Sequence, residues 1–185
     1  MKNKVVVLDR DGVINEDSDN FIKSADEWVP LKGSLEAISR LKKAGYIVAV
    51  ATNQSGLARK LFDRNALQAM HDKMDSLLSQ RGGSVDSIEF CPHGPSDNCL
   101  CRKPKPGMLL NICKQFNIKP SETVFVGDTF TDVQAARMAG CRSVLVKTGK
   151  GQRTLDKHGS IEGTTVYDDL SHFVREFLKQ NNARK

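Results

Sequence analysis

The sequence contains few aromatic residues and no long hydrophobic run. Its 185 residues include one Trp and two Tyr, and aromatic residues make up 6% of the chain. No apolar stretch approaches the roughly 20 residues that a membrane-spanning helix needs. The apolar stretch near the N-terminus is short and runs directly into charged residues, unlike the hydrophobic part of a signal peptide. We therefore expect a cytoplasmic protein with no membrane segment.

The composition also argues against a disulfide framework and against a nucleic-acid groove. Five cysteines in a chain of cytosolic character direct attention to metal binding. The net charge of +6 favours anionic partners, although part of the excess comes from basic residues near the C-terminus. A nucleic-acid groove would combine a basic stripe with aromatic platforms, and the sequence has no aromatic run. We expect a small anionic partner and no nucleic acid.

Short β-branched runs alternate with helical patterns along the whole chain. The runs are almost continuously apolar, as expected of parallel strands that are covered on both faces. They span Val5–Leu8, Tyr46–Ala51, Ser87–Phe90, Thr123–Val126, Ser143–Lys147 and Thr165–Tyr167. Helical periodicity lies between them, and we expect Asp63 and Thr131 to cap two of the helices.

This alternation predicts an α/β fold with a doubly wound parallel sheet. The sequence shows no internal repeat and no linker, so we expect one domain over residues 1–185. In sheets of this kind, ligands bind beyond the C-terminal ends of the strands. Polar motifs are therefore of most interest where they follow a predicted strand.

Two aspartates, Asp9 and Asp11, follow the first strand directly. Residues two apart in an extended chain point to the same side, so the two carboxylates are expected to converge. Close carboxylates need a compensating cation, or one of them takes up a proton. A carboxylate next to a divalent cation can act as a nucleophile, and a neighbour with a raised pKa can act as general acid and base. A surface turn at Gly12 is the structural alternative.

Three further polar motifs follow in order along the chain. Thr52-Asn53-Gln54-Ser55 ends the second strand, Arg102-Lys103-Pro104 forms a stiff basic loop, and Gly127-Asp128 with Asp132 ends the fourth strand. Each motif by itself is also explained by a helix cap, a turn or a surface loop. Their joint position beyond the strands makes one shared site at this edge of the sheet the stronger interpretation.

The order of these motifs resembles the haloacid dehalogenase superfamily of phosphohydrolases over roughly residues 5–150. The resemblance implies that Asp9 attacks phosphorus and forms an aspartyl phosphate, and that Asp11 protonates the leaving oxygen and then activates water. It also implies that Thr52 and Asn53 hold the phosphoryl group and that Lys103 neutralises its developing charge.

The same resemblance implies a catalytic magnesium ion. Asp9, the backbone carbonyl of Asp11 and Asp128 would surround it, and Asp132 would support these ligands. Magnesium prefers hard oxygen ligands in an octahedral arrangement, which this set can supply while leaving room for water and phosphate.

A second metal site is predicted in the loop at about residues 91–101. Cys91, His93, Cys99 and Cys101 form two tight pairs across a Pro- and Gly-rich stretch. Three thiolates and an imidazole make a closed four-ligand set that is typical of structural zinc. The loop ends directly at Arg102 and Lys103, so we expect zinc to fix the backbone that aims them. Reduced cysteines without metal are the alternative, and Cys113 and Cys141 are expected in the core.

The loop before Arg102-Lys103-Pro104 is similar to that of the heptose-1,7-bisphosphate 7-phosphatases and the histidinol-phosphate phosphatases. The segments LDRDGVIN, TNQSG and CRKPKPGM favour the first group. This resemblance implies a monomeric, magnesium-dependent phosphatase without a separate cap domain. It would remove the 7-phosphate of D-glycero-D-manno-heptose 1,7-bisphosphate during the synthesis of lipopolysaccharide core precursors. Histidinol phosphate is the alternative substrate. A nucleic-acid 3′-phosphatase and an inactive sugar-phosphate sensor fit the residues less well.

Without a cap, loops at the mouth of the sheet must recognise the substrate. The candidates are Asp17, Ser18, Asp19 and Asn20 after the first strand, with Asn53, Gln54 and Ser55 after the second. Arg102 is expected to bind the second, anomeric phosphate because a guanidinium fork matches phosphate geometry. The segment Asn20-Phe21-Ile22 departs from the D-x-G-Y-V pattern of the family, so the hydroxyl contacts there do not carry over directly.

Overall fold

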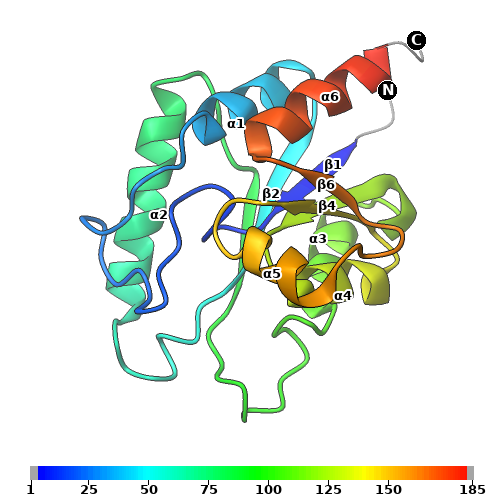
Figure 1. The fold of residues 1–185 in the computed structure, drawn as a ribbon. Helices are drawn as coiled ribbons and strands as arrows, with labels where there is room; N and C mark the ends of the chain where they lie inside the picture. The colour runs from blue at the N-terminus through cyan, green and yellow to red at the C-terminus, as the bar shows by residue number, and fades with distance from the viewer. Residues whose placement is uncertain (1–3, 183–185) are drawn as a thin grey trace.

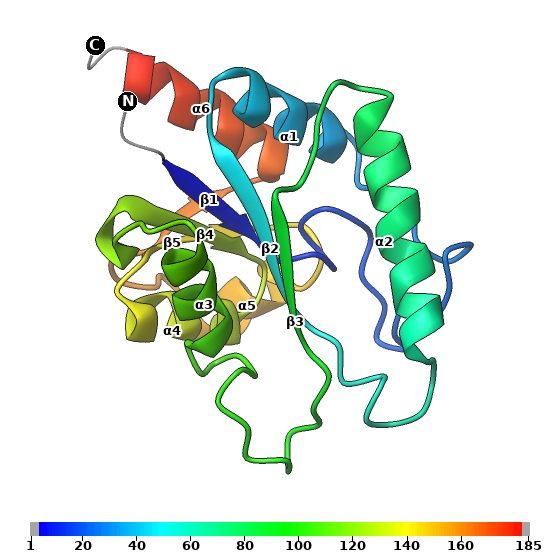
Figure 2. The same ribbon diagram turned by 180° about the vertical axis from the view of Figure 1, so that it is seen from behind.

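The computed structural model describes residues 4–182 and contains a six-stranded parallel sheet in the order β3-β2-β1-β4-β5-β6. Helices cover both faces of this sheet (Figures 1 and 2). In chain order the elements are β1 (Val5–Leu8), α1 (Ser34–Lys43), β2 (Ile47–Asn53), α2 (Arg64–Ser79), β3 (Ser87–Cys91), α3 (Gly107–Gln115), η1 (Pro120–Glu122), β4 (Thr123–Gly127), α4 (Phe130–Ala139), β5 (Arg142–Val146), α5 (Gly151–His158), β6 (Thr165–Tyr167) and α6 (Leu170–Asn182).

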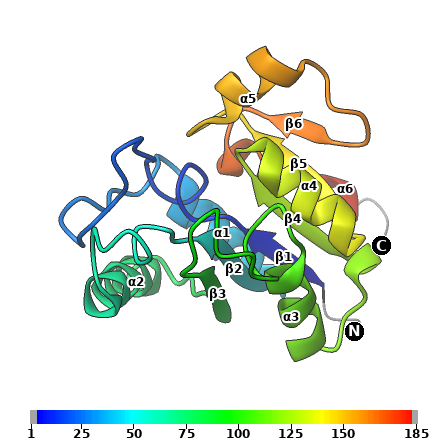
Figure 3. The ribbon, with the colours of Figure 1, turned by 90° about the horizontal axis from the view of Figure 1, so that it is seen from below.

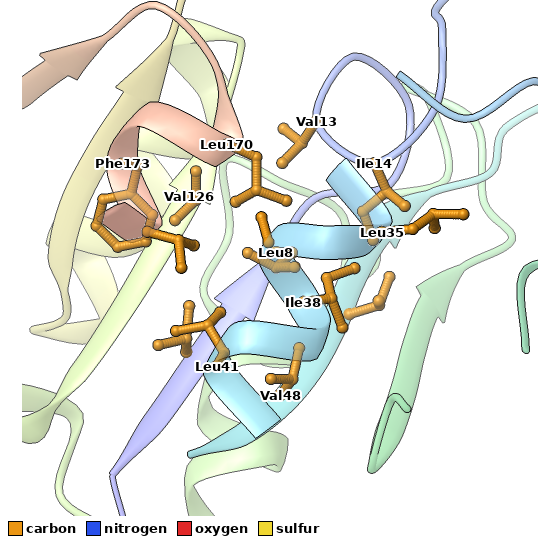
Figure 4. Packing of buried hydrophobic residues seen from close by; sticks show 14 of the residues in the cluster. Leu8, Val13, Ile14, Leu35, Ile38, Leu41, Val48, Val126, Leu170 and Phe173 are labelled. Atoms are coloured by element: carbon orange, nitrogen blue, oxygen red, sulfur yellow. The ribbon is translucent and has the colours of Figure 1, made fainter. Parts of the chain in front are cut away.

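The central strands are buried on both faces because their alternate side chains enter two different cores. Val6 and Leu8 of β1 belong to the cluster that contains residues of α1 and α6, whereas Val5 and Val7 belong to the cluster with α3 and α4. Figure 4 shows the first cluster, with Leu35, Ile38, Leu41 and Phe173 gathered around Leu8. Continuous apolar runs are required by this two-sided burial.

All six predicted strands are present, with ends shifted by no more than two residues. Asp63 caps α2 as expected, because its side chain accepts a hydrogen bond from the backbone N–H of Ala66. The prediction that Thr131 caps α4 is wrong. Thr129 has the extended backbone and forms a reciprocal capping box with Asp132, so α4 begins at Phe130.

The order of the strands places a topological switch between β1 and β4. The chain leaves β1 towards β2 and β3, and it leaves β4 towards β5 and β6, although β1 and β4 are hydrogen-bonded neighbours. Loops that diverge at such a point leave a crevice at the C-terminal ends of the strands. Figure 3 looks at the molecule from below, where the loops after β1, β2 and β3 gather.

Within residues 4–182, long loops follow β1 and β3, and neither contains a helix or a strand. The loop after β3, green in Figure 1, extends furthest below the sheet. No helix among the described residues is long and apolar enough to cross a membrane.

Candidate active site

Asp9 lies at the end of β1, where its backbone N–H still donates to the carbonyl of Val126 on β4 at 2.8 Å. Its carboxylate Oδ2 lies 2.8 Å from the Nζ of Lys103. Lys103 also contacts the Oδ1 of Asp132 at 2.7 Å and donates to the carbonyl of Ala51 at 2.9 Å. The lysine therefore joins the end of β1, the C-terminal part of β2 and the first turn of α4, and it holds the Asp9 side chain in place.

Asp9, Asp128 and Asp132 form a cluster of buried carboxylates. One oxygen from each lies within 4.8 Å of the others. Both oxygens of Asp132 are engaged, one by Lys103 and one by the backbone N–H of Thr129. Asp128 accepts a hydrogen bond from the backbone N–H of Lys150 at 2.7 Å and makes no ion pair among residues 4–182. Asp9 and Asp128 thus have coordination capacity left for a cation.

The electrostatics of the cluster show an unbalanced negative charge. Burial, together with the charge of Asp132, raises the pKa of Asp9 to about 7 despite the attraction of Lys103. Burial, Asp132 and Asp9 likewise raise the pKa of Asp128 well above its usual range. Burial alone would lower the pKa of Lys103, but the two carboxylates outweigh it and raise that pKa. Three carboxylates and one ammonium group leave room for a divalent cation.

Two glycines allow the backbone to approach Asp128 closely. A Cβ atom on Gly12 would lie 2.2 Å from the Oδ2 of Asp128, and one on Gly149 would lie 2.3 Å from the same atom. Both glycines have positive φ angles, of +82° and +57°. Any side chain at these positions would displace the Asp128 carboxylate, so the carboxylate cluster depends on both glycines.

Asp11 lies beside the cluster but turns its carboxylate towards Arg10. The guanidinium of Arg10 donates to both oxygens of Asp11, and Asn15 and Gln54 donate one hydrogen bond each. Burial would raise the pKa of Asp11, but Arg10 and these hydrogen bonds outweigh burial and lower it. Of the two aspartates that follow β1, Asp9 therefore has the raised pKa and Asp11 the lowered one.

The segment after β2 supports both Lys103 and Asp11. Asn53 exchanges hydrogen bonds with the backbone of Lys103, donating to its carbonyl at 3.2 Å and accepting from its N–H at 3.1 Å. Gln54 donates to the hydroxyl of Thr52 at 2.9 Å as well as to Asp11 at 3.0 Å. The side chains of Asn53 and Gln54 therefore position other groups of the site.

These groups open into a cavity of about 350 Å³. This volume suits a small molecule. Of the predicted catalytic, substrate-binding and magnesium-binding residues, all but Asn20 line it, including Ser18, Ser55 and Arg102. The cavity also contains residues that sequence reasoning did not find, namely Phe21, Ile22, Arg59, Thr129 and Lys150. No spacing pattern connects them, because they come from loops that only the fold brings together.

The loop after β1 is tied to α5 by ion pairs. Asp17 lies 2.8 Å from the Nζ of Lys150, and Asp19 lies 2.9 Å from a guanidinium nitrogen of Arg153. The hydroxyl of Ser18 accepts from the backbone N–H of Asn20 at 3.1 Å. The predicted substrate-binding carboxylates of this loop thus already have cationic partners, and the loop is anchored to the opposite side of the cavity.

The four predicted zinc ligands converge in the loop after β3. Cys91 lies 3.6 Å from both Cys99 and the Nδ1 of His93, and Cys101 lies 3.2 Å from Cys91 and 3.4 Å from His93. A tetrahedral zinc site with bonds of about 2.3 Å places sulfur atoms about 3.8 Å apart. The cysteines form no disulfide. The four groups therefore fit a tetrahedral metal ion after a small expansion.

This cluster is connected directly to Arg102. The backbone N–H of Arg102 donates to the sulfur of Cys99 at 3.4 Å, and its guanidinium donates to the carbonyl of His93 at 3.1 Å. Because Lys103 is the next residue, any displacement of the cluster would be passed to the ammonium group beside Asp9.

Comparisons with known proteins agree with this geometry. A model of the HAD-hydrolase-like family matches residues 100–173. The D-glycero-beta-D-manno-heptose-1,7-bisphosphate 7-phosphatase of Pseudomonas aeruginosa is 54% identical over 179 residues, covering 97% of this chain and 100% of that protein. The enzyme of the same name from Neisseria meningitidis serogroup B is 51% identical over 182 residues, covering 97% of both.

The crystal structure of the D,D-heptose 1,7-bisphosphate phosphatase from Bordetella bronchiseptica, complexed with magnesium and phosphate, superimposes with a TM-score of 0.94. It is 52% identical in sequence and covers 96% of this chain and 99% of that one. By sequence, by fold and by the arrangement of its site, the chain belongs to the heptose-1,7-bisphosphate 7-phosphatase family of HAD hydrolases.

Proposed function

We propose that this chain is a magnesium-dependent phosphatase that removes the 7-phosphate of D-glycero-beta-D-manno-heptose 1,7-bisphosphate. The observation that carries the proposal is the pair formed by Asp9 and Lys103 at the switch point of the sheet, next to the carboxylate of Asp128. The names of the relatives favour the heptose bisphosphate over histidinol phosphate and supply the beta anomer, which the motifs alone leave open.

Asp9 is the proposed nucleophile. Its Oδ1 accepts the backbone N–H of Arg10 at 2.7 Å and its Oδ2 contacts Lys103, so the carboxylate is held with little freedom. An oxygen of Asp9 attacks phosphorus, the bond from phosphorus to the sugar oxygen breaks, and an aspartyl phosphate forms. Asp11 enters this step as the protonated acid, which requires the bound anionic phosphate to raise a pKa that Arg10, Asn15 and Gln54 lower in the substrate-free protein. It gives this proton to the leaving sugar oxygen and later takes one from the water that hydrolyses the intermediate.

Positive charge around the phosphoryl group lowers the barrier to this attack. Magnesium bound by Asp9, Asp128 and the backbone carbonyl of Asp11 would supply a Lewis acid that neutralises phosphoryl oxygens. Lys103 adds a second positive charge and Thr52 adds a hydroxyl donor. Asp132 holds Lys103 in place, since both of its oxygens are already engaged.

We propose zinc for the Cys91, His93, Cys99 and Cys101 cluster, in a structural role. The convergence of four ligands at the end of β3 and in the loop after it supports this proposal, because a loop with no helix or strand gains its order from metal binding. Its catalytic effect would be indirect, through the backbone of Arg102 and Lys103.

We further propose that residues 1–185 act as one catalytic domain, as a monomer in the cytoplasm. In support, the groups of the site gather at one end of one sheet. The charged cavity and the small number of aromatic residues also support a small sugar bisphosphate as substrate.

The test is phosphate release by the purified protein with magnesium from both anomers of heptose 1,7-bisphosphate and from histidinol phosphate. We expect kcat/KM for the beta anomer to exceed that for histidinol phosphate by about a hundredfold or more, and Asp9→Asn to abolish turnover. A preference for histidinol phosphate would reassign the substrate and leave the chemistry intact. Turnover by Asp9→Asn at the wild-type rate would overturn the mechanism.

A further inference from the structure

Arg10 separates the two catalytic aspartates in the sequence, yet its side chain is completely buried. Its relative exposure is 0%, and it is among the largest fully buried side chains among residues 4–182. A buried guanidinium is costly unless its donors are satisfied. A strand-end residue with its side chain pointing into solvent would avoid this cost, so the contacts of Arg10 call for a specific explanation.

The guanidinium of Arg10 binds the Asp11 carboxylate through two nitrogens, in an arrangement called the fork below. Its Nη2 lies 2.9 Å from Oδ1 and 3.0 Å from Oδ2, and its Nε lies 3.1 Å from Oδ1. Paired N–H donors fix the plane of a carboxylate as well as its position. A single ammonium donor would leave the carboxylate free to rotate.

The opposite end of the guanidinium is anchored to α2. Its Nη1 lies 3.5 Å from the Nε2 of His71 and 3.9 Å from the sulfur of Met70. Both residues are buried on α2, far along the chain from Arg10. Asp11 is therefore connected through Arg10 to a helix that lies outside the cavity, and it is additionally held by Asn15 and Gln54.

We propose that Arg10 is a positioning residue that aims the Asp11 carboxylate at the leaving oxygen of the substrate. This inference rests on the proposed function, in which Asp11 protonates that oxygen. General acids contribute about 10²–10⁴-fold to such steps. A misplacement of about 1 Å in a catalytic group can cost about 10²-fold. The fork between two rigid partners prevents such a misplacement.

The experiment compares two leaving groups in the same variant. Nitrophenolate departs without a proton, whereas a sugar alkoxide needs one, and kcat/KM reports the reaction through this first transfer. For Arg10→Met we expect kcat/KM for the heptose bisphosphate to fall about 10- to 100-fold more than kcat/KM for p-nitrophenyl phosphate. Arg10→Lys keeps the charge without the fork, and we expect a selective loss of the same kind, though smaller.

Asp11→Asn and Met74→Leu are the reference variants. Asp11→Asn should show the same selective loss, and adding Arg10→Met to it should cause no further selective loss. Met74→Leu changes a buried methionine of the same helix that makes no hydrogen bond to Arg10 among residues 4–182, and it should leave the ratio of the two kcat/KM values unchanged. If Arg10→Met does not fold, the ratio in Arg10→Lys decides the question.

The outcomes separate the two proposals. The Arg10 variants could lose kcat/KM equally on both substrates while Asp11→Asn loses it selectively on the heptose bisphosphate. That outcome would overturn the role of Arg10, and the acid role of Asp11 would stand. An equal loss in Asp11→Asn itself would overturn the acid role, and the positioning role with it. A selective loss that adds fully to that of Asp11→Asn would show that Arg10 acts independently of Asp11.

Discussion

At the scale of single residues, the cations of the cavity differ in how many partners they already have. Lys150 is paired with Asp17, and Arg102 donates to the carbonyl of His93. Arg59 makes no ion pair among residues 4–182, and its guanidinium lies over the ring of Phe21, 5.7 Å from the centroid. An exposed guanidinium without an acidic partner is well suited to bind an anion.

We therefore predict that Arg59→Ala raises KM for the bisphosphate about tenfold or more, with little change in kcat. A charge-assisted hydrogen bond contributes about 1.5–3 kcal/mol, and about 1.4 kcal/mol corresponds to a tenfold change in binding. KM for a heptose 7-phosphate that lacks the anomeric phosphate should not change. Lys60→Ala is the matched control, since Lys60 is an exposed cation that lines a neighbouring groove. An equal rise of KM for both substrates would contradict the prediction.

The residues that sequence reasoning could place are those whose position follows from a strand end. Asp9, Thr52 and Asp128 each come directly after or at the end of a buried strand, so the topology brings them together. Phe21 and Arg59 could not be placed in this way. Phe21 has a positive φ of 65°, which turns its ring back over the cavity, and neither composition nor period indicates such a turn.

At the scale of elements, the loop after β3 connects a metal site to the catalytic lysine. We predict that Cys99→Ser lowers zinc content by one equivalent and lowers kcat about tenfold or more, because groups that orient catalytic ligands typically contribute 10- to 100-fold. Metal analysis, circular dichroism and phosphate release would be measured on the same sample. Ser96→Ala, in the same loop, is the matched control. Full activity after loss of zinc would contradict the coupling.

The helices show why periodicity predicts some elements and misses others. α1, α2, α3 and α6 each bury a regular apolar stripe, which the sequence displays. The sequence of α5 contains Leu155 as its one large apolar residue, and its buried positions include Gly151 and Thr154. The start of α4 was placed two residues late because Thr129 and Thr131 are both plausible caps, and only the reciprocal bond with Asp132 distinguishes them.

At the scale of the whole molecule, the sheet concentrates negative charge at one end of a chain whose net charge is +6. The carboxylates of Asp9 and Asp128 are buried by the same packing that forms the cores on both faces. In the metal-free protein, burial therefore works against their charged forms. Stability, metal binding and pH are consequently linked through these two groups.

We predict that the stabilisation of the fold by magnesium increases as pH rises through about 7. The pKa of Asp9 is raised to about 7 and that of Asp128 well above its usual range, so the metal-free folded protein holds protons that the unfolded chain has released. The contribution of Asp9 and Asp128 to the free energy of unfolding of the metal-free protein therefore falls as pH rises. Magnesium requires the charged carboxylates and removes this loss. The measurement is the difference in Tm between saturating magnesium and magnesium-free buffer, from about pH 6 to about pH 8.

The difference in Tm between the two buffers isolates the magnesium site. The titration of any other group, such as His71, changes Tm equally in both buffers and therefore cancels. We expect the difference to grow with pH in the wild-type protein and to grow less steeply in Asp128→Asn, which removes one of the two carboxylates and leaves Asp9. A difference that stays constant or shrinks with pH in the wild type would mean that Asp9 and Asp128 are already charged without metal. Lys103 would then suffice to keep both carboxylates charged in the metal-free protein.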